Sequence, residues 1–191
     1  MANSENTSHP LPTSESVPDN SPVHAYLVLR LDNSDYAIRV EHVREIITSV
    51  TPSPVPGAPD YLMGVINLRG KILPMVDLRR RFRLPIAADD ERDCYIVLMV
   101  EIDDQLVELG VRVDAVCEVA RISEQCVDNT NVLDEFSPDR LVFQGVAKTT
   151  SGVKLVLDTR QLISQLRRDV HLTLASNQST NSQNGCLVTT G

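Results

Sequence analysis

Residues 64–77, GVINLRGKILPMVD, are echoed by residues 145–158, GVAKTTSGVKLVLD. Both stretches open with Gly-Val, reach an Asp thirteen positions after the first Gly, and carry a second Gly between the two. In the first stretch, apolar runs lie on either side of residues 67–71, and Gly70 can take the positive φ angle that a tight turn requires. We therefore predict a β-hairpin with Arg69 at its tip, within an internally duplicated β protein.

The stretches upstream of these hairpins also repeat. YLVLRLDNSDYAIRVEHVREI, which starts at Tyr26, parallels YIVLMVEIDDQLVELGVRVDAVCEV, which starts at Tyr95. Each contains an apolar strand, an acidic turn and a second strand, so residues 25–40 are predicted to form a hairpin around the turn at 32–35. Many short strands of this kind indicate β-barrels or sandwiches.

Helices are predicted at three places. The apolar residues of RVEHVREIIT (39–48) fall at helical spacing, which favours a short amphipathic helix there. DLRRRFRL (77–84) reads as a helical turn that closes the first module. In TRQLISQLRR (159–168), Leu162, Ile163 and Leu166 share one face, so this helix should cap a barrel.

The two ends of the chain differ in composition from the middle. Residues 1–23 are rich in Ser, Pro, Asn and Thr, and residues 169–191 are rich in Ser, Thr, Asn and Gln, so we predict disordered tails at both ends. Residues 24–168 form the predicted domain, which divides into modules at roughly 24–93 and 94–168. Strand exchange between the modules is left open.

Composition limits the partners. The formal net charge of −8 and the isoelectric point near 4.9 argue against nucleic acid and favour a protein partner. The N-terminus lacks the basic start and apolar run of a signal peptide, and no apolar run is long enough to span a bilayer. We expect a cytoplasmic protein without direct membrane insertion.

Catalytic and metal-binding patterns are missing from the sequence. The four cysteines lie far apart and are predicted to be small buried hydrophobic residues rather than disulfide partners. The four histidines show no metal-ligand spacing, and His42 is predicted to be a solvated polar residue. Asp77 and Asp158 occupy equivalent repeat positions, which favours a structural turn role for both. We therefore expect no enzyme activity, no metal and no cofactor.

Basic side chains cluster around the first hairpin and the segment that follows it. Arg69, Lys71 and the arginines at 79, 80, 81 and 83 stand in an otherwise acidic chain. The arginines at 79–83 fit a solvated rim that balances the acidic connector at 89–93, although a docking surface is the alternative. Arg69 differs because a rigid turn holds its planar guanidinium, which suits bidentate recognition of a carboxylate.

These residues carry a family resemblance. YLVLRLDNSDYAIRVEHVREI, GVINLRGKILPMVDLRRRF and VELGVRVDAVCEV, in this order, resemble the CheW-type coupling proteins of bacterial chemotaxis over roughly residues 24–166. The resemblance implies two SH3-like, five-stranded β-barrels packed together, with short helices. It also implies a non-catalytic adaptor that couples a chemoreceptor's cytoplasmic tip to the regulatory domain of a CheA-type histidine kinase.

The resemblance further assigns partner-binding residues. It places receptor contact in a groove between the barrels, and it gives Glu45 and Arg69 a linked role, for which we predict an ion pair that braces the NLRG turn. The positions implied for partner binding are Val40, Val43, Glu45, Gly64, Asn67, Arg69, Gly70, Leu109, Gly110, Val113 and Val116. Each valine taken singly fits barrel core equally well. Gly64 and Gly110 could instead permit close backbone approach.

Several expectations follow for assembly and pathway. Other CheW-like domains are expected as neighbours in rings or arrays, and the protein is expected to be recruited to membrane-bound receptor arrays. The second repeat carries KTTSG in place of the arginine turn, so the two barrels should have different partners. Two alternatives stay open: a coupling protein of a non-flagellar pathway, such as pilus-based motility or second-messenger control, and a small-molecule-binding β-barrel domain.

Overall fold

The computed structural model describes residues 21–85, 94–128 and 142–180, with the backbone alone for 170–180. The acidic connector at 89–93 and nearly all of the predicted N-terminal tail lie outside these residues. In chain order the elements are β1 (Val23–Leu31), β2 (Ser34–Arg39), η1 (Val40–His42), β3 (Val43–Ile47), β4 (Leu62–Leu68), β5 (Lys71–Asp77), α1 (Leu78–Arg81), β6 (Cys94–Ile102), β7 (Gln105–Val113), β8 (Ala115–Ser123), η2 (Glu124–Cys126), β9 (Val127–Asp128), β10 (Phe143–Thr149), β11 (Gly152–Leu157) and α2 (Thr159–Thr180).

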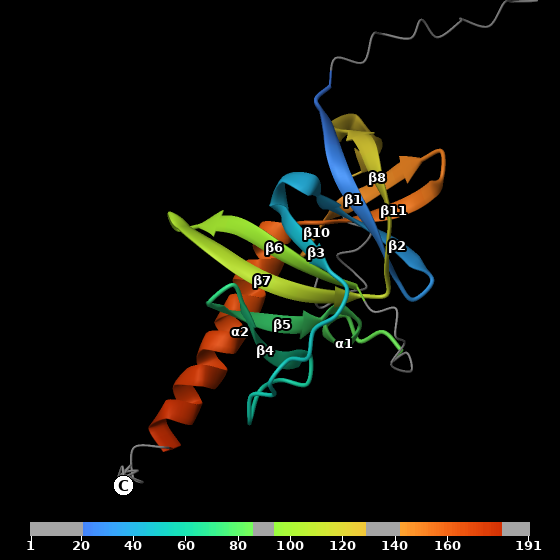
Figure 1. Ribbon diagram of the computed structural model, residues 1–191. Helices are drawn as coiled ribbons and strands as arrows, with labels where there is room; N and C mark the ends of the chain where they lie inside the picture. The colour runs from blue at the N-terminus through green and yellow to red at the C-terminus, as the bar shows by residue number, and fades with distance from the viewer. Residues whose placement is uncertain (1–20, 86–93, 129–141, 181–191) are drawn as a thin grey trace, which may run out of the picture.

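The strands form two sheets, so the predicted mostly-β fold is confirmed. Sheet A has six strands in the order β8-β1-β2-β11-β10-β9, and sheet B has five in the order β3-β6-β7-β5-β4. Neighbouring strands run antiparallel except at β2/β11 in sheet A and β5/β7 in sheet B, which are parallel. Figure 1 shows the two sheets side by side, with α2 leaving the region between them and extending past sheet B.

Each sheet combines strands from both halves of the chain. The first hairpin of the chain, β1–β2, lies in sheet A beside the last hairpin, β10–β11. The hairpin β6–β7, which opens the second repeat, lies in sheet B beside β3 and β5 of the first repeat. The two repeats have therefore exchanged their first hairpins.

The duplication extends to local detail. The register of β4–β5 shifts just before Gly64, and the register of β10–β11 shifts just before Gly145. The carboxylate of Asp77 accepts a hydrogen bond from the Arg80 amide at the start of α1, and Asp158 accepts one from the Gln161 amide at the start of α2. Side-chain capping satisfies amides that have no partner within a helix. The predicted structural role of both aspartates is confirmed.

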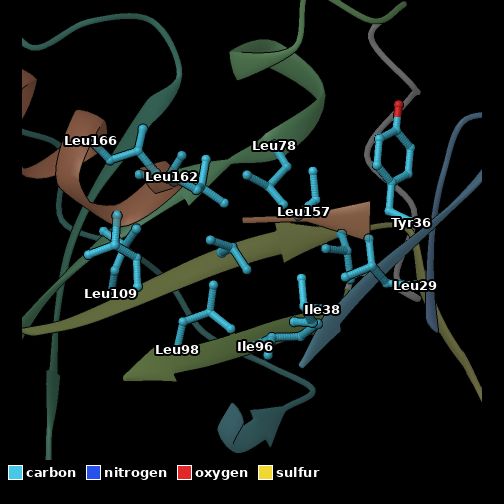
Figure 2. Close-up of a cluster of buried hydrophobic side chains, with 14 of the residues drawn as sticks. Leu29, Tyr36, Ile38, Leu78, Ile96, Leu98, Leu109, Leu157, Leu162 and Leu166 are labelled. Carbon is cyan, nitrogen blue, oxygen red and sulfur yellow. The ribbon is translucent and has the colours of Figure 1, made fainter. Parts of the chain in front are cut away.

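The largest apolar cluster fills the space between the two sheets. Its members come from inward faces of both sheets and from α1 and α2, and they include Leu29, Ile38, Leu78, Ile96, Leu98, Leu109, Leu157, Leu162 and Leu166 (Figure 2). Leu162, Ile163 and Leu166 are buried in this cluster, so the predicted apolar face of the last helix is confirmed. Smaller clusters around Tyr26 and Tyr95 fill the other faces of sheets A and B.

The predicted helix at 39–48 is wrong. The segment begins with a single 3-10 turn, η1, and continues as β3, which pairs with β6. Val43, Ile46 and Ile47 are β-branched residues that fit a strand, and pairing with β6 supplies hydrogen bonds that local spacing does not reveal.

The predicted boundary of the C-terminal tail is also wrong, because α2 continues to Thr180 instead of ending at 168. Neither Pro nor Gly occurs between 169 and 180, so no residue in the sequence stops the helix there. Only residues 181–191 of the predicted tail lie outside the described part of the chain. Within the described residues, no helix combines the length and the apolar composition that a membrane crossing requires.

Two of the cysteines also differ from expectation. Cys94 is half-buried, whereas Cys117 and Cys126 are exposed, and all three are free thiols. Cys117 lies on β8, an edge strand of sheet A that carries several exposed side chains, and Cys126 lies in η2. Apolar neighbours in the sequence did not reveal this exposure. Cys186 lies outside the described residues.

Candidate protein-docking surface

The β4–β5 turn holds Arg69 at its tip, as predicted. Arg69 and Gly70 both have positive φ angles, 53° and 84°, and Leu68 pairs with Lys71 on either side of them. Positive φ at both central residues is what a two-residue type I′ turn needs. Asn67 braces the turn because its Oδ1 accepts a hydrogen bond from the Gly70 amide at 2.8 Å.

The predicted ion pair between Arg69 and Glu45 is present. One guanidinium nitrogen of Arg69 donates to Oε2 of Glu45 at 2.8 Å. The Arg69 side chain is 71% exposed and the Glu45 side chain is 22% exposed, so the guanidinium remains accessible while its partner is largely covered. The pair orients a charged planar group at the surface without removing it from solvent.

Glu108 of β7 extends this arrangement and was missed in the sequence. Its carboxylate accepts from Arg44 of β3 and, at 3.1 Å, from Lys71 of β5, and it is only 14% exposed. The one signal was the charged residue inside the apolar run LVELGV. Glu45, Asn67, Arg69 and Gly70 together with Arg44, Lys71 and Glu108 are called the turn cluster below.

The equivalent hairpin of sheet A has a different turn. Thr149 contacts the Ser151 hydroxyl at 3.2 Å and donates to the Gly152 carbonyl at 2.8 Å. Neither side chain is charged, so this turn offers hydroxyl groups where the turn of sheet B offers a guanidinium. The two hairpin tips therefore differ in chemistry and also in backbone conformation, because Thr150 and Ser151 do not take the positive φ angles of Arg69 and Gly70.

The apolar residues assigned to a groove divide into two groups. Leu109 and Val113 are buried members of the cluster between the sheets. Val40, Val43 and Val116 are only partly buried and pack against the same cluster. All five residues therefore belong to the same buried cluster or pack against it, but only Val40, Val43 and Val116 are partly exposed.

One face of strand β3 is apolar and points toward the buried cluster between the two sheets. Val43 pairs with Leu98 and Ile46 pairs with Ile96, and both partners belong to the buried cluster between the sheets. Paired residues of an antiparallel ladder point to the same side of the sheet. Ile46 nevertheless remains 45% exposed, so Val43 and Ile46 on this face of β3, together with Val40 of η1, are called the β3 ridge below.

The two assigned glycines are in contact with the chain itself. A Cβ on Gly64 would lie 2.1 Å from the carbonyl oxygen of Ser53, whose backbone pairs with Val65. A Cβ on Gly110 would lie 2.2 Å from the sulfur of Met75. Close approach within the chain accounts for both glycines, and their role in partner binding stays a prediction.

The arginines after β5 are held by internal partners. Arg79 donates two hydrogen bonds of 2.6 Å to the carboxylate of Asp114, and Arg80 contacts Asp77. Arg81 donates to Gln165 of α2 and lies over the ring of Tyr61. These contacts tie α1 to sheet B and to α2, which favours a structural role for Arg79–Arg81.

His42 is not the solvated residue that was predicted. His42 lies in η1, and its side chain is half-buried. This burial lowers the pKa of the imidazole. No group of three or more His, Cys, Asp or Glu residues in the described segments is arranged to hold a metal ion.

The structure is that of a duplicated β protein with two candidate docking surfaces, the exposed guanidinium on a rigid turn and the half-exposed apolar ridge. Comparison with known proteins gives the family. The sequence model described as the CheW-like domain matches residues 25–167. The chemotaxis protein CheW of Thermotoga maritima is 31% identical over 140 residues, which cover 73% of this chain and 87% of that protein.

Further relatives agree with this match. The chemotaxis protein CheW of Helicobacter pylori is 26% identical over 147 residues, which cover 77% of this chain and 86% of that protein. The crystal structure of the scaffolding protein TtCheW from Thermoanaerobacter tengcongensis superposes with a TM-score of 0.62 at 29% identity, and covers 71% of this chain and 88% of that one.

The chain belongs to the CheW-like family. The predicted adaptor function, which couples chemoreceptors to a CheA-type histidine kinase in chemosensory signalling, is confirmed at the level of this family. The SH3-like barrel architecture agrees with the fold of the solved relative.

Proposed function

We propose that this chain binds a chemoreceptor's cytoplasmic tip along the β3 ridge and uses the turn cluster in the same assembly with the regulatory domain of a CheA-type kinase. The observation that carries the proposal is the β3 ridge itself. Ile46 is 45% exposed and Val43 is partly buried, on a strand at the edge of sheet B beside the seam between the sheets. Apolar side chains in a seam of this kind suit the apolar face of a partner helix.

The turn cluster would add specificity to this contact. Arg69 offers planar donors to a carboxylate, and Glu45 limits the orientations that its guanidinium can take. A group held in one orientation loses less conformational entropy on binding. The different turn of sheet A supports separate partners for the two barrels, so that one copy can lie between two proteins.

The role in signalling would be thermodynamic rather than catalytic. A scaffold that holds receptor and kinase together can transmit a receptor's conformational change only if the contacts differ between the two states. Contacts through two different surfaces of one copy need not close on a pair, so further CheW-like domains can join the assembly as rings or arrays at the membrane-bound receptors. We place the protein in the cytoplasm beside those receptors.

Co-sedimentation of the full chain with a receptor cytoplasmic fragment and a CheA-type kinase from the same genome tests the proposal. We expect a ternary assembly with the wild type, and a loss of at least tenfold in receptor affinity with Val43→Asp and Ile46→Asp. Val153→Asp is the matched control, because Val153 is an exposed apolar residue on β11 of sheet A. Equal binding by the wild type and both β3 variants would contradict the assignment of the β3 ridge.

A further inference from the structure

A polar pocket lies away from the turn cluster, where η1 meets the start of α2. Its volume is about 280 Å³, and residues of β2, η1, β10 and the first turn of α2 line it. The side chains that matter for its chemistry are Arg39, Glu41, His42, Gln144, Thr159 and Arg160. Leu157 is the one apolar residue among those that line the pocket. The lining therefore offers polar partners to water or to a polar ligand.

Two buried polar atoms at this pocket have no protein partner. Thr159 is only 1% exposed, and among the described residues its hydroxyl has no hydrogen-bond partner. The same holds for Nδ1 of His42, which is also buried. A buried polar group without a partner costs roughly 1–3 kcal/mol, so a water molecule or a ligand that hydrogen-bonds to these two atoms would offset that cost.

Positive charge is available at the same place. Arg160 lines the pocket and is exposed, and no carboxylate among the described residues lies within ion-pair distance of it. Arg39 forms long ion pairs of 3.4 Å and 3.5 Å with Glu41 and Glu124, and its guanidinium lies over the ring of Tyr26. The first turn of α2 adds amides that lack a partner within the helix, and its dipole favours negative charge.

The acidic residues of the pocket limit the charge that it can accept. The carboxylate of Asp158 is used as the cap of α2, where it accepts from the Gln161 amide at 3.0 Å. Glu41 lies near both Arg39 and His42. These two negative groups would repel a doubly charged phosphate more strongly than a singly charged group, and a planar carboxylate fits a guanidinium with two parallel hydrogen bonds.

We propose that the pocket between η1 and the start of α2 is a binding site for a carboxylate group, held by Arg160 and Arg39 and by the free hydroxyl of Thr159. His42 contributes a further hydrogen bond through Nδ1. The carboxylate can come from a small organic acid or from an acidic side chain of a protein partner. The residues that line this site include none of the β3 ridge and none of the turn cluster, so variants of the site test it separately from the proposed receptor contact.

The test is a titration of the full chain, followed by amide chemical shifts in ¹H–¹⁵N spectra, with sodium succinate against sodium chloride of equal ionic strength. We expect saturable shifts at His42, Thr159 and Arg160 with succinate only. A bound carboxylate also favours the protonated imidazole, so the pKa of His42 should rise on saturation. That pKa is set now by burial and by the charges of Glu41, Arg160, Arg39 and Asp158.

Variants separate this site from general charge effects. Arg160→Gln should weaken succinate binding at least tenfold and Thr159→Val at least threefold. Arg168→Gln removes the same charge from an exposed position of the same helix, and should leave binding unchanged. Shifts that do not saturate, or an equal loss in Arg168→Gln, would overturn the proposal.

A second titration distinguishes the two sources. The peptide acetyl-Gly-Glu-Gly-amide is compared with its Gln counterpart, and inorganic phosphate is titrated in parallel. Tighter binding of the Glu peptide than of succinate supports an acidic side chain of a partner, and the reverse order supports a small acid. Binding of phosphate without binding of either carboxylate would overturn the assignment to carboxylates.

Discussion

Arg69 and Glu45 join the two opposite edges of sheet B. Arg69 follows β4 at one edge, Glu45 lies on β3 at the other, and the 2.8 Å hydrogen bond spans the gap between them. The pairing of Ser53 with Val65 covers the same edge of β4. A sheet edge presents unpaired backbone groups, so these contacts help to close the barrel. A partner that binds β3 and a partner that binds the turn would therefore act on one linked structure.

Breaking this ion pair should affect assembly far more than stability. For Arg69→Ala and Glu45→Gln we expect the free energy of unfolding to fall by less than about 1 kcal/mol, because exposed ion pairs contribute little. Binding in the receptor and kinase assembly should weaken at least tenfold. Urea denaturation measures the first quantity and co-sedimentation the second.

Lys148→Ala is the matched control for Arg69→Ala, because Lys148 is an exposed cation just before the equivalent turn of sheet A. It should leave receptor binding unchanged. If Arg69→Ala and Lys148→Ala weakened the assembly equally, the effect would be one of net charge, and the specific role of the turn would be lost.

The two glycines of the β4–β5 hairpin should respond very differently to alanine. At Gly64, with φ of 137°, a Cβ would lie 2.1 Å from the Ser53 carbonyl oxygen, so Gly64→Ala must displace backbone. We expect a loss of about 2–4 kcal/mol in unfolding free energy. At Gly70, with φ of 84°, a Cβ meets no atom within 4 Å, so Gly70→Ala should cost only about 1 kcal/mol. Equal losses in urea denaturation would contradict this account of Gly64.

Local chemistry allowed the hairpins to be predicted. The turn at Arg69–Gly70 and the turn at 32–35 were read from Gly and acidic residues between apolar runs; the first lies where it was placed, and the second is shorter, because β2 begins at Ser34. The segment at 39–48 failed because its apolar spacing fits a helix, while its actual conformation depends on pairing with β6, about fifty residues later in the chain. Long-range partners of this kind leave no signal in a local window.

The candidate site likewise contains residues that the sequence predicted and residues that it did not reveal. The pair of Glu45 with Arg69 followed from the family resemblance and is present. Glu108 was missed because its two basic partners come from β3 and β5, which only the assembled sheet brings to β7. The sequence left the exchange of hairpins between the repeats open, because an exchanged and an unexchanged duplication have the same pattern of strands and turns.

The helix α2 should contribute strongly to stability through its apolar face. Leu162 is fully buried between the sheets beside Leu78 and Leu109 (Figure 2). Leu162→Ala removes that contact and leaves a cavity, so we expect a loss of about 2–5 kcal/mol in unfolding free energy. Arg168→Ala, on the same helix but exposed, should change it by less than about 0.5 kcal/mol. A small effect at Leu162 in urea denaturation would mean that α2 is not part of the cooperative core.

Acid should destabilise the protein through Asp35. Burial alone would raise the pKa of this carboxyl, but hydrogen bonds from Arg30 and Lys154, together with their charges, outweigh burial and hold the pKa below its usual value. A folded-state pKa below the unfolded one means that the unfolded chain binds the proton first as pH falls. The stabilisation is therefore complete above the usual aspartate pKa near 4 and is lost as pH falls through the lowered value.

Asp35→Asn should make the free energy of unfolding less dependent on pH below about 4, and should also lower it at neutral pH. Lys154 is only 1% exposed, and its other carboxylate partner, Glu118, lies 3.3 Å away on β8. Without the charge of Asp35, the buried ammonium loses one of two compensating anions, so we expect a loss of about 1–3 kcal/mol at pH 7. Urea denaturation at pH 7 and pH 3 measures both effects. Asp104→Asn, at an exposed aspartate between β6 and β7, is the control, and an equal pH dependence of the two variants would show that Asp35 is not the titrating group.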